Sequence, residues 1–140
     1  MIVYLDTSAL MKLYVTETGQ EIVLARVQSA DRIATALITY VEMFAAFARL
    51  EKERRITATG FSKLAEQLEA NWASYWTLEL TRVIARKAAL MARRHGLRGY
   101  DAVQLASALE LRGSDSRIEF LSFDERLNAA AQREKLSVPD

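Results

Sequence analysis

Short apolar runs with β-branched members alternate along this chain with longer segments whose apolar residues recur at helical spacing. Residues 2–5, 32–35 and 119–123 have the length and composition of buried strands. Strands that alternate with helices pair in parallel, and the helices cover both faces of their sheet. The chain is therefore predicted to form an α/β domain with a short, mainly parallel central sheet flanked by helices.

The helical segments lie between and after these strands. The predicted helices cover residues 8–14, 17–30, 40–55, 59–75, 81–94, 100–113 and 124–131. Thr39 and Glu42 match a capping box, with Thr39 as the cap and Glu42 at the third helical position. Residues 76–78 fit either a strand or a turn, and residues 136–138 are predicted to form an edge strand before Pro139.

The composition indicates one folded domain over residues 1–140. Of the 140 residues, 51% are hydrophobic and 26% are charged, which is the balance of a single globular core. Because the chain has no cysteine, disulfide scaffolds, thiolate-bound metals and cysteine nucleophiles are excluded, and the reducing cytoplasm is the expected location. The N-terminus lacks the features of a secretory signal, and no apolar run is long enough to cross a bilayer.

Four acidic residues fall at corresponding places in these predicted elements. Asp6 ends the first strand, and Asp124 follows the last one. Glu42 and Asp101 stand at the starts of helices, and the helix that begins near Asp101 leads into the last strand. In a parallel sheet the carboxyl ends of the strands and the amino ends of the connecting helices lie along one edge, where ligands bind. The four carboxylates are therefore expected to meet at that edge.

Taken alone, each of these acids is more simply explained as a helix cap, because acids at helix N-termini accept hydrogen bonds from free backbone N–H groups. As a group the four acids need a further explanation, because two carboxylates about 4 Å apart repel by ~4 kcal/mol at an effective dielectric of about 20. Protons or cations must offset that repulsion. With oxygen ligands, no thiolate and one histidine, Mg²⁺ or Mn²⁺ fits better than zinc, and such ions activate water for attack on phosphorus.

The charge balance is compatible with a nucleic-acid partner. The chain carries 19 basic and 18 acidic residues, so setting four acids aside in a metal site leaves a basic excess over the rest of the molecule. Arg93, Arg94 and Arg98, shortly before Asp101, are the candidate RNA-binding residues. A solvated basic helix end that complements its own dipole explains the same arginines.

Four short motifs carry these acids in order: residues 4–10 (YLDTSAL), 40–42 (YVE), 99–102 (GYDA) and 122–127 (SFDERL). They resemble the acid-bearing motifs of the PIN-domain nucleases and, among these, of the VapC-type toxin ribonucleases of VapBC toxin–antitoxin systems. The resemblance covers nearly the whole chain, and no acid position is missing.

This resemblance implies a PIN-like nuclease domain that cleaves RNA with Mg²⁺ or Mn²⁺, forms a homodimer and is inhibited by a cognate antitoxin protein. It implies that Asp6 and Asp101 are the principal metal ligands. Glu42 and Asp124 would complete the catalytic and metal-binding cluster, directly or through water.

Two serines are expected to support the acids, and three apolar residues are candidates for protein contacts. By the same resemblance, Ser8 would orient the first acid and Ser122 would support the last. The apolar residues Phe44, Phe47 and Leu50 are candidates for dimer or antitoxin contacts, although a buried core stripe is the favoured interpretation.

Other interpretations fit less well. A PIN scaffold that binds RNA or a partner but cleaves weakly differs from the nuclease only in metal-dependent cleavage. A haloacid-dehalogenase-like phosphotransferase needs a second Asp where this chain has Ser8, and residues 96–99 match the GxxG loop of a KH domain without its compact element order. His95 is better explained by a helix C-terminus than as a general base, and Trp72 and Trp76 as core or dimer anchors than as base-stacking residues.

Overall fold

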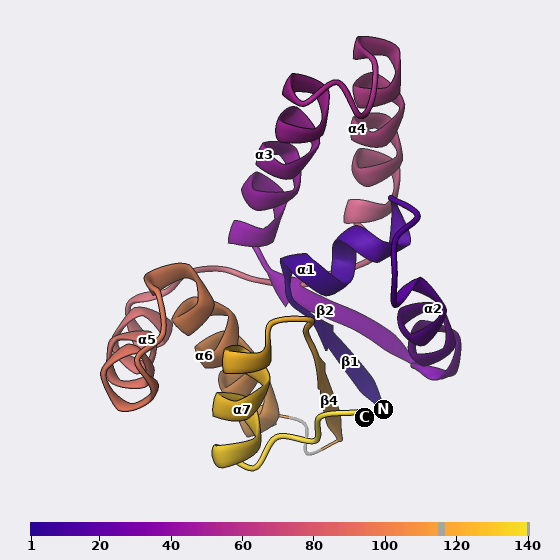
Figure 1. The fold of residues 1–140 in the computed structure, drawn as a ribbon. Helices are drawn as coiled ribbons and strands as arrows, with labels where there is room; N and C mark the ends of the chain where they lie inside the picture. The colour runs from indigo at the N-terminus through magenta and orange to yellow at the C-terminus, as the bar shows by residue number, and fades with distance from the viewer. Residues whose placement is uncertain (115–116, 140) are drawn as a thin grey trace.

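In the computed structural model, which describes residues 1–114 and 117–139, a parallel four-stranded sheet lies between helices (Figure 1). The strands are β1 (Ile2–Leu5), β2 (Arg32–Ala36), β3 (Trp76–Leu78) and β4 (Ile118–Leu121), in the spatial order β3-β2-β1-β4. β1 pairs in parallel with both β2 and β4, and β2 pairs in parallel with β3. The predicted α/β class and parallel sheet are confirmed, and residues 76–78 form a strand.

Helices connect the strands and cover the sheet. They are α1 (Thr7–Leu10), which runs into the 3₁₀ turn η1 (Met11–Leu13), α2 (Gln20–Ser29), α3 (Ile38–Lys52), α4 (Ala58–Trp72), α5 (Arg82–His95), α6 (Gly99–Ser114) and α7 (Glu125–Arg133). In Figure 1, α3 and α4 run beside each other and extend away from the sheet, whereas α6 and α7 lie next to β4 and α5 packs beside α6. Across residues 1–114 and 117–139, no helix combines the length and the apolar composition that a membrane span needs.

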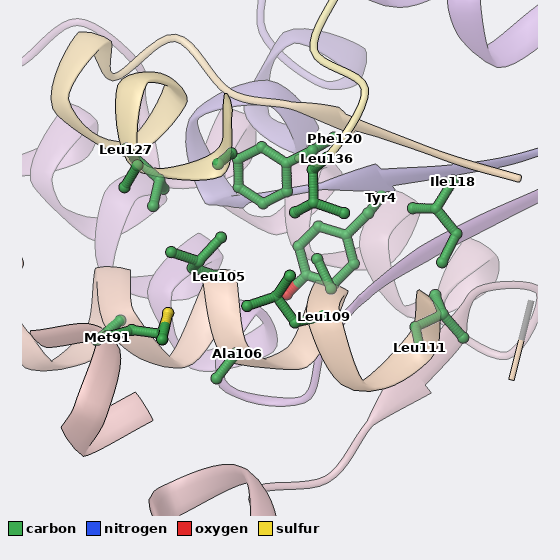
Figure 2. Packing of buried hydrophobic residues seen from close by; sticks show 14 of the residues in the cluster. Tyr4, Met91, Leu105, Ala106, Leu109, Leu111, Ile118, Phe120, Leu127 and Leu136 are labelled. Atoms are coloured by element: carbon green, nitrogen blue, oxygen red, sulfur yellow. The ribbon is translucent and has the colours of Figure 1, made fainter. Parts of the chain in front are cut away.

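Strand β1 divides the core into two halves, because successive side chains of a strand point to opposite faces. Ile2 and Tyr4 pack among residues of α5, α6 and α7, whereas Val3 and Leu5 pack among residues of α1 to α4. Figure 2 shows the first half, in which Tyr4 stacks on Phe120 of β4 with ring centroids 5.6 Å apart. Burial on both faces explains why this strand is a continuous apolar run.

The predicted capping box at the start of α3 is wrong. The helix begins at Ile38, and its N-cap Leu37 makes no side-chain cap hydrogen bond. Thr39 is buried inside the first turn, and its hydroxyl accepts a hydrogen bond from Nε2 of Gln104 at 2.9 Å. Glu42 lies beyond the first turn. The side chains of Thr39 and Glu42, which the local pattern assigned to the cap, therefore form tertiary polar contacts instead.

Strand β4 ends at Leu121 rather than at residue 123, because the next two residues bond to Asp6 and Ser8 instead of a strand. Ser122 donates its hydroxyl to Oδ2 of Asp6 at 2.6 Å. The backbone N–H of Phe123 donates to Oγ of Ser8 at 2.9 Å. These bonds replace the next rungs of the strand ladder and join the end of β4 to the start of α1.

The predicted edge strand over residues 136–138 is also wrong. In the part of the chain that the structure describes, this segment forms only an isolated parallel bridge between Glu119 and Ser137. Lys135 has a positive φ of 64°, so the chain reverses immediately before the segment. Pro139 then follows, and proline has no N–H to extend a ladder.

Candidate active site

A cleft of about 260 Å³, which we call the acid cleft, lies where β1 and β4 end. Its lining includes all of the predicted acids: Asp6, Glu42, Asp101 and Asp124. Asp6 follows β1, Asp101 lies in the first turn of α6, and Asp124 is the N-cap of α7. The parallel topology therefore brings together acids from four elements that are far apart in the sequence.

Asp6 is the most enclosed of these acids, with 4% of its surface exposed. Its Oδ1 accepts hydrogen bonds from the backbone N–H of Ala9 at 2.9 Å and from the hydroxyl of Ser8 at 2.7 Å. Burial raises the pKa of Asp6 to about 6, the hydrogen bonds from Ser122, Ser8 and Ala9 oppose that rise, and the charge of Asp101 adds to it. Asp6 is thus both the N-cap of α1 and a high-pKa carboxyl in the cleft.

Ser122 connects the first acid with the last. Its hydroxyl donates to Asp6 and accepts the backbone N–H of Asp124 at 3.0 Å. Oδ1 of Asp124 accepts the N–H of Leu127 at 3.0 Å and so caps α7. The geometry therefore gives Ser122 a bond to the Asp6 carboxyl group, and its bond to Asp124 is to the backbone N–H.

Glu42 is held by two residues that the sequence analysis missed. Thr7 donates its hydroxyl to Oε1 of Glu42 at 2.6 Å, and Nε2 of Gln104 lies 3.0 Å from the same oxygen. Gln104 is 2% exposed, and its Oε1 accepts the hydroxyl of Tyr4 at 2.6 Å. The only signal in the sequence is a glutamine between apolar residues on α6, because a buried amide needs polar partners.

A chain of buried hydroxyls continues from Gln104 to the sheet. The Gln104 amide contacts Thr39, whose hydroxyl lies 2.8 Å from that of Thr35. Thr35, in β2, also donates to the backbone carbonyl of Leu5 at 2.7 Å. The network ties α6, α3, β2 and β1 together behind Glu42, so the position of this acid depends on the packing of all four elements.

The electrostatics of Asp101 show that the acids repel one another. Burial is the largest cause that raises the pKa of Asp101, and the charges of Asp124 and Glu42 raise it further. Arg98 acts in the opposite direction. Because these charges lie on different elements, the raised pKa is a consequence of the tertiary fold.

The donor set of the acid cleft suits a hard divalent cation, since it consists of carboxylate and other oxygens whose charges oppose ionisation. Within residues 1–114 and 117–139, however, no three acidic or histidine side chains are arranged to hold one ion. The chemistry therefore fits Mg²⁺ or Mn²⁺, and direct ligation by three side chains requires them to adjust.

The three predicted RNA-binding arginines have different surroundings. Arg98 lines a second cleft, which shares Asp101 and Asp124 with the acid cleft. Arg93 and Arg94 are exposed in the last turn of α5 and do not line either cleft. Arg94 instead pairs with Glu134 at 2.8 Å.

The remaining candidates pack away from the acids. Nε2 of His95 lies 2.7 Å from Oε2 of Glu134, and the histidine side chain is 3% exposed at the end of α5. Phe47 is fully buried, and Phe44 packs in the same half of the core, as the stripe interpretation predicts. Leu50 is half-buried. Both tryptophans pack against the core, Trp72 on the α3–α4 side and Trp76 on the α5–α7 side.

Comparison with known proteins agrees with this geometry. The family model described as "PIN domain" matches residues 3–133. Ribonuclease VapC45 of Mycobacterium tuberculosis (strain CDC 1551 / Oshkosh) is 35% identical over 130 residues, which cover 93% of this chain and 89% of the relative. The chain belongs to the PIN-domain family. The predicted membership of the PIN-domain family is thereby confirmed, and a KH module or a haloacid dehalogenase is the wrong family for this chain.

Solved structures support the same fold. The crystal structure of FitAcB from Neisseria gonorrhoeae superposes with a TM-score of 0.74 at 21% identity and covers 100% of this chain and 97% of that one. A toxin–antitoxin complex from Klebsiella pneumoniae gives a TM-score of 0.63 at 17% identity, with 87% and 86% of the two chains covered. At these identities the likeness concerns the fold of the PIN domain.

Proposed function

We propose that this PIN domain is a metal-dependent endoribonuclease and acts as the toxin of a type II toxin–antitoxin pair. The observation that carries the proposal is the entry of Asp6, Glu42, Asp101 and Asp124, from four separate elements, into one cleft. The 35% identical relative over 93% of the chain is named a ribonuclease, which supports RNA as the substrate. Mutual repulsion of the acids supports a divalent cation as cofactor.

Each acid has a proposed role, which the resemblance to the PIN-domain nucleases implies. Asp6 and Asp101 would be the principal metal ligands, and Glu42 and Asp124 would complete the site. When bound, Mg²⁺ or Mn²⁺ lowers the pKa of water and neutralises charge that develops on the phosphodiester.

Neighbouring side chains fix the directions of these acids. Ser8 and Ser122 bond the two oxygens of Asp6, and Thr7 and Gln104 hold one oxygen of Glu42. Their proposed role is to keep the carboxylates oriented toward a bound cation, which reduces the reorganisation that the reaction requires.

The proposed partners are RNA, a cognate antitoxin and a second copy of the chain. The solved structure from Klebsiella pneumoniae, which has the same fold, is a toxin–antitoxin complex, and this supports an antitoxin partner. For a homodimer, support comes from Leu80, Val83 and Leu90, which are 54%, 60% and 60% exposed near and on α5. Val83 and Leu90 are seven positions apart on α5 and so lie on one side of the helix, and a contiguous apolar patch on a helix face is typical of contact surfaces.

A cleavage assay on defined structured RNAs tests the function. The purified chain, free of antitoxin, is expected to cleave RNA with Mg²⁺ or Mn²⁺ and to stop when a chelator is added. Asp6→Asn and Asp101→Asn are each expected to reduce cleavage by at least about 100-fold, because transition-state charge loses its compensation. Circular dichroism confirms that both variants are folded. Wild-type rates in both variants would refute the proposed roles.

One observation favours a second candidate function. Because no three acidic or histidine side chains in the described residues are arranged to hold one ion, a PIN scaffold that binds RNA or a partner with little cleavage also fits. The same assay separates the two functions. RNA binding without any cleavage in Mg²⁺ or Mn²⁺ would establish the weak scaffold in place of the nuclease.

A further inference from the structure

A second cleft of about 200 Å³, which we call the arginine cleft, adjoins the acid cleft. Arg98 and Arg126 line it together with the backbone segment that joins α5 to α6. Tyr100, Asp101 and Asp124 line both clefts and form their shared wall. A chain molecule that occupies the acid cleft can therefore continue directly into the arginine cleft.

The arginine cleft places the guanidinium groups of Arg98 and Arg126 beside the carboxylates of Asp101 and Asp124. Both Arg98 and Arg126 are exposed, and in the described part of the chain neither forms an ion pair. Arg126 lies in the first turn of α7, where the helix dipole disfavours a cation. Asp101 and Asp124 act on Arg98 through their charges without an ion-pair contact, and no carboxylate of the described residues pairs with Arg126, so both guanidinium groups keep N–H donors for an anionic ligand.

Tyr100 adds an aromatic surface at the shared wall. The residue is 43% exposed, and its hydroxyl accepts a hydrogen bond from Nη1 of Arg98 at 3.2 Å. Exposed aromatic rings beside a cationic groove stack on nucleotides of single strands. A guanidinium group binds phosphate through paired N–H donors, whereas a lysine ammonium group acts as a point charge.

We propose that the arginine cleft binds the phosphate next to the one that is cleaved, with Arg98 and Arg126 as its ligands and Tyr100 packed against the intervening nucleotide. This inference rests on the proposed function, because it places the scissile phosphate in the acid cleft. It assigns a binding role to Arg126 and Tyr100 and makes RNA with at least two consecutive phosphates the preferred substrate.

Binding of a fluorescein-labelled single-stranded decaribonucleotide, measured by anisotropy in chelator over a salt series, tests the cleft without cleavage. Arg98→Ala and Arg126→Ala are each expected to weaken binding about tenfold. Each should also reduce the slope of log K against log salt by roughly 0.7, the value for one phosphate contact on a single strand. Arg133→Ala, at the far end of α7, is the matched control and should change neither quantity.

Charge-conserving variants distinguish phosphate binding by the two arginines from a role in which their positive charge only offsets the negative charge of the nearby acids. Arg98→Lys and Arg126→Lys keep the charge but lose the paired donors, so affinity should fall about threefold or more. Tyr100→Phe should retain binding that Tyr100→Leu loses. Full affinity and an unchanged salt slope in both arginine-to-alanine variants would overturn the inference.

Cleavage of short substrates provides the second readout. On a dinucleoside monophosphate, which has a single phosphate, Arg126→Ala should match the wild type. On a trinucleoside diphosphate its KM should rise about tenfold with kcat little changed. A wild type that cleaves RNA, with the arginine variants identical to it, would retain the nuclease and reject the arginine cleft. A wild type that never cleaves RNA, but whose RNA binding depends on both arginines, would reject the nuclease and retain the arginine cleft as a phosphate-binding site.

Discussion

Asp6 serves two purposes that conflict electrostatically. As the N-cap of α1 it accepts backbone and hydroxyl hydrogen bonds, which favour the ionised form. Its burial beside Asp101 disfavours that form more strongly, so the pKa rises from 3.8 to about 6. A carboxyl group that is costly to ionise in the free protein is suited to a site where a cation later compensates its charge.

The pH dependence of stability follows from this shift. Because folded Asp6 holds its proton more tightly than unfolded Asp6, it contributes stability below pH 3.8 that is lost as pH rises through about 6. A shift of this size corresponds to about 3 kcal/mol in the free energy of unfolding. In chelator, urea unfolding should therefore show wild type losing stability relative to Asp6→Asn between pH 4 and pH 7. A constant difference across that range would show that burial does not raise the pKa of Asp6.

Gln104 is the clearest positioning residue outside the predicted motifs, since its amide joins Tyr4 to Glu42. Gln104→Leu leaves the buried Tyr4 hydroxyl without its acceptor and should cost about 1–3 kcal/mol in the free energy of unfolding. Adding Tyr4→Phe removes the stranded donor, so the double variant should lose less than the sum of the single variants. Urea denaturation of all four proteins measures this coupling, and strict additivity would show that the bond contributes nothing.

At the scale of elements, the end of α5 sets the position of the arginine cleft. Gly96 is the C-cap of α5 with φ 64°, a left-handed conformation that lets the chain leave the helix toward Arg98. Its neighbourhood is open, because a Cβ at this position would meet nothing within 4 Å. Backbone conformation, rather than steric contact, is therefore the reason for glycine at this position.

Substitution at Gly96 tests that reason. Gly96→Ala should destabilise the protein by about 1–2 kcal/mol through the left-handed backbone, and Gly96→Asn by less, because asparagine tolerates this region. Gly113→Ala is the matched control, since Gly113 lies within α6 with no close neighbours and alanine should there be neutral or stabilising. Thermal melts rank the three variants. Equal effects at both glycines would show that conformation does not matter at the C-cap.

At the scale of the whole molecule, the fold stores charge repulsion at the carboxyl edge of its sheet. Strand order β3-β2-β1-β4 puts the ends of β1 and β4 side by side, and α3 and α6 add their own acids to the same cleft. No single element experiences this repulsion in isolation. The repulsion arises only when the domain folds and brings the acids together. The cation-free protein is therefore less stable than the protein with a bound cation.

Removing one charge from the cluster should stabilise the free protein. Asp101→Asn is expected to raise the melting temperature in chelator by a few degrees, because Asp124 and Glu42 both disfavour its charge. Mg²⁺ should raise the melting temperature of the wild type but not that of the variant. Glu66→Gln, an exposed acid on α4, is the control and should respond like the wild type. A clear loss of melting temperature in Asp101→Asn would favour a helix-cap role for this residue.

Much of the fold was predictable because its signals are local. The apolar run of β1 and the helical spacing of α5 depend on residues close in sequence, and both elements lie near their predicted bounds. The capping box failed for the opposite reason: Thr39 bonds Gln104, which is 65 positions away. Residues 136–138 failed because a turn at Lys135 and the following proline leave room for a single bridge.

The sequence by itself determined the α/β class and the common edge to which four acids are brought, because strand and helix patterns are local and parallel connections have one geometry. Only the tertiary structure decided the partners of those acids. Ser122 bonds Asp6 across 116 positions, and Arg126 shares a cleft with Arg98. Such contacts depend on strand register and on side-chain rotamers, which the packing of the whole core sets and no short stretch of sequence encodes.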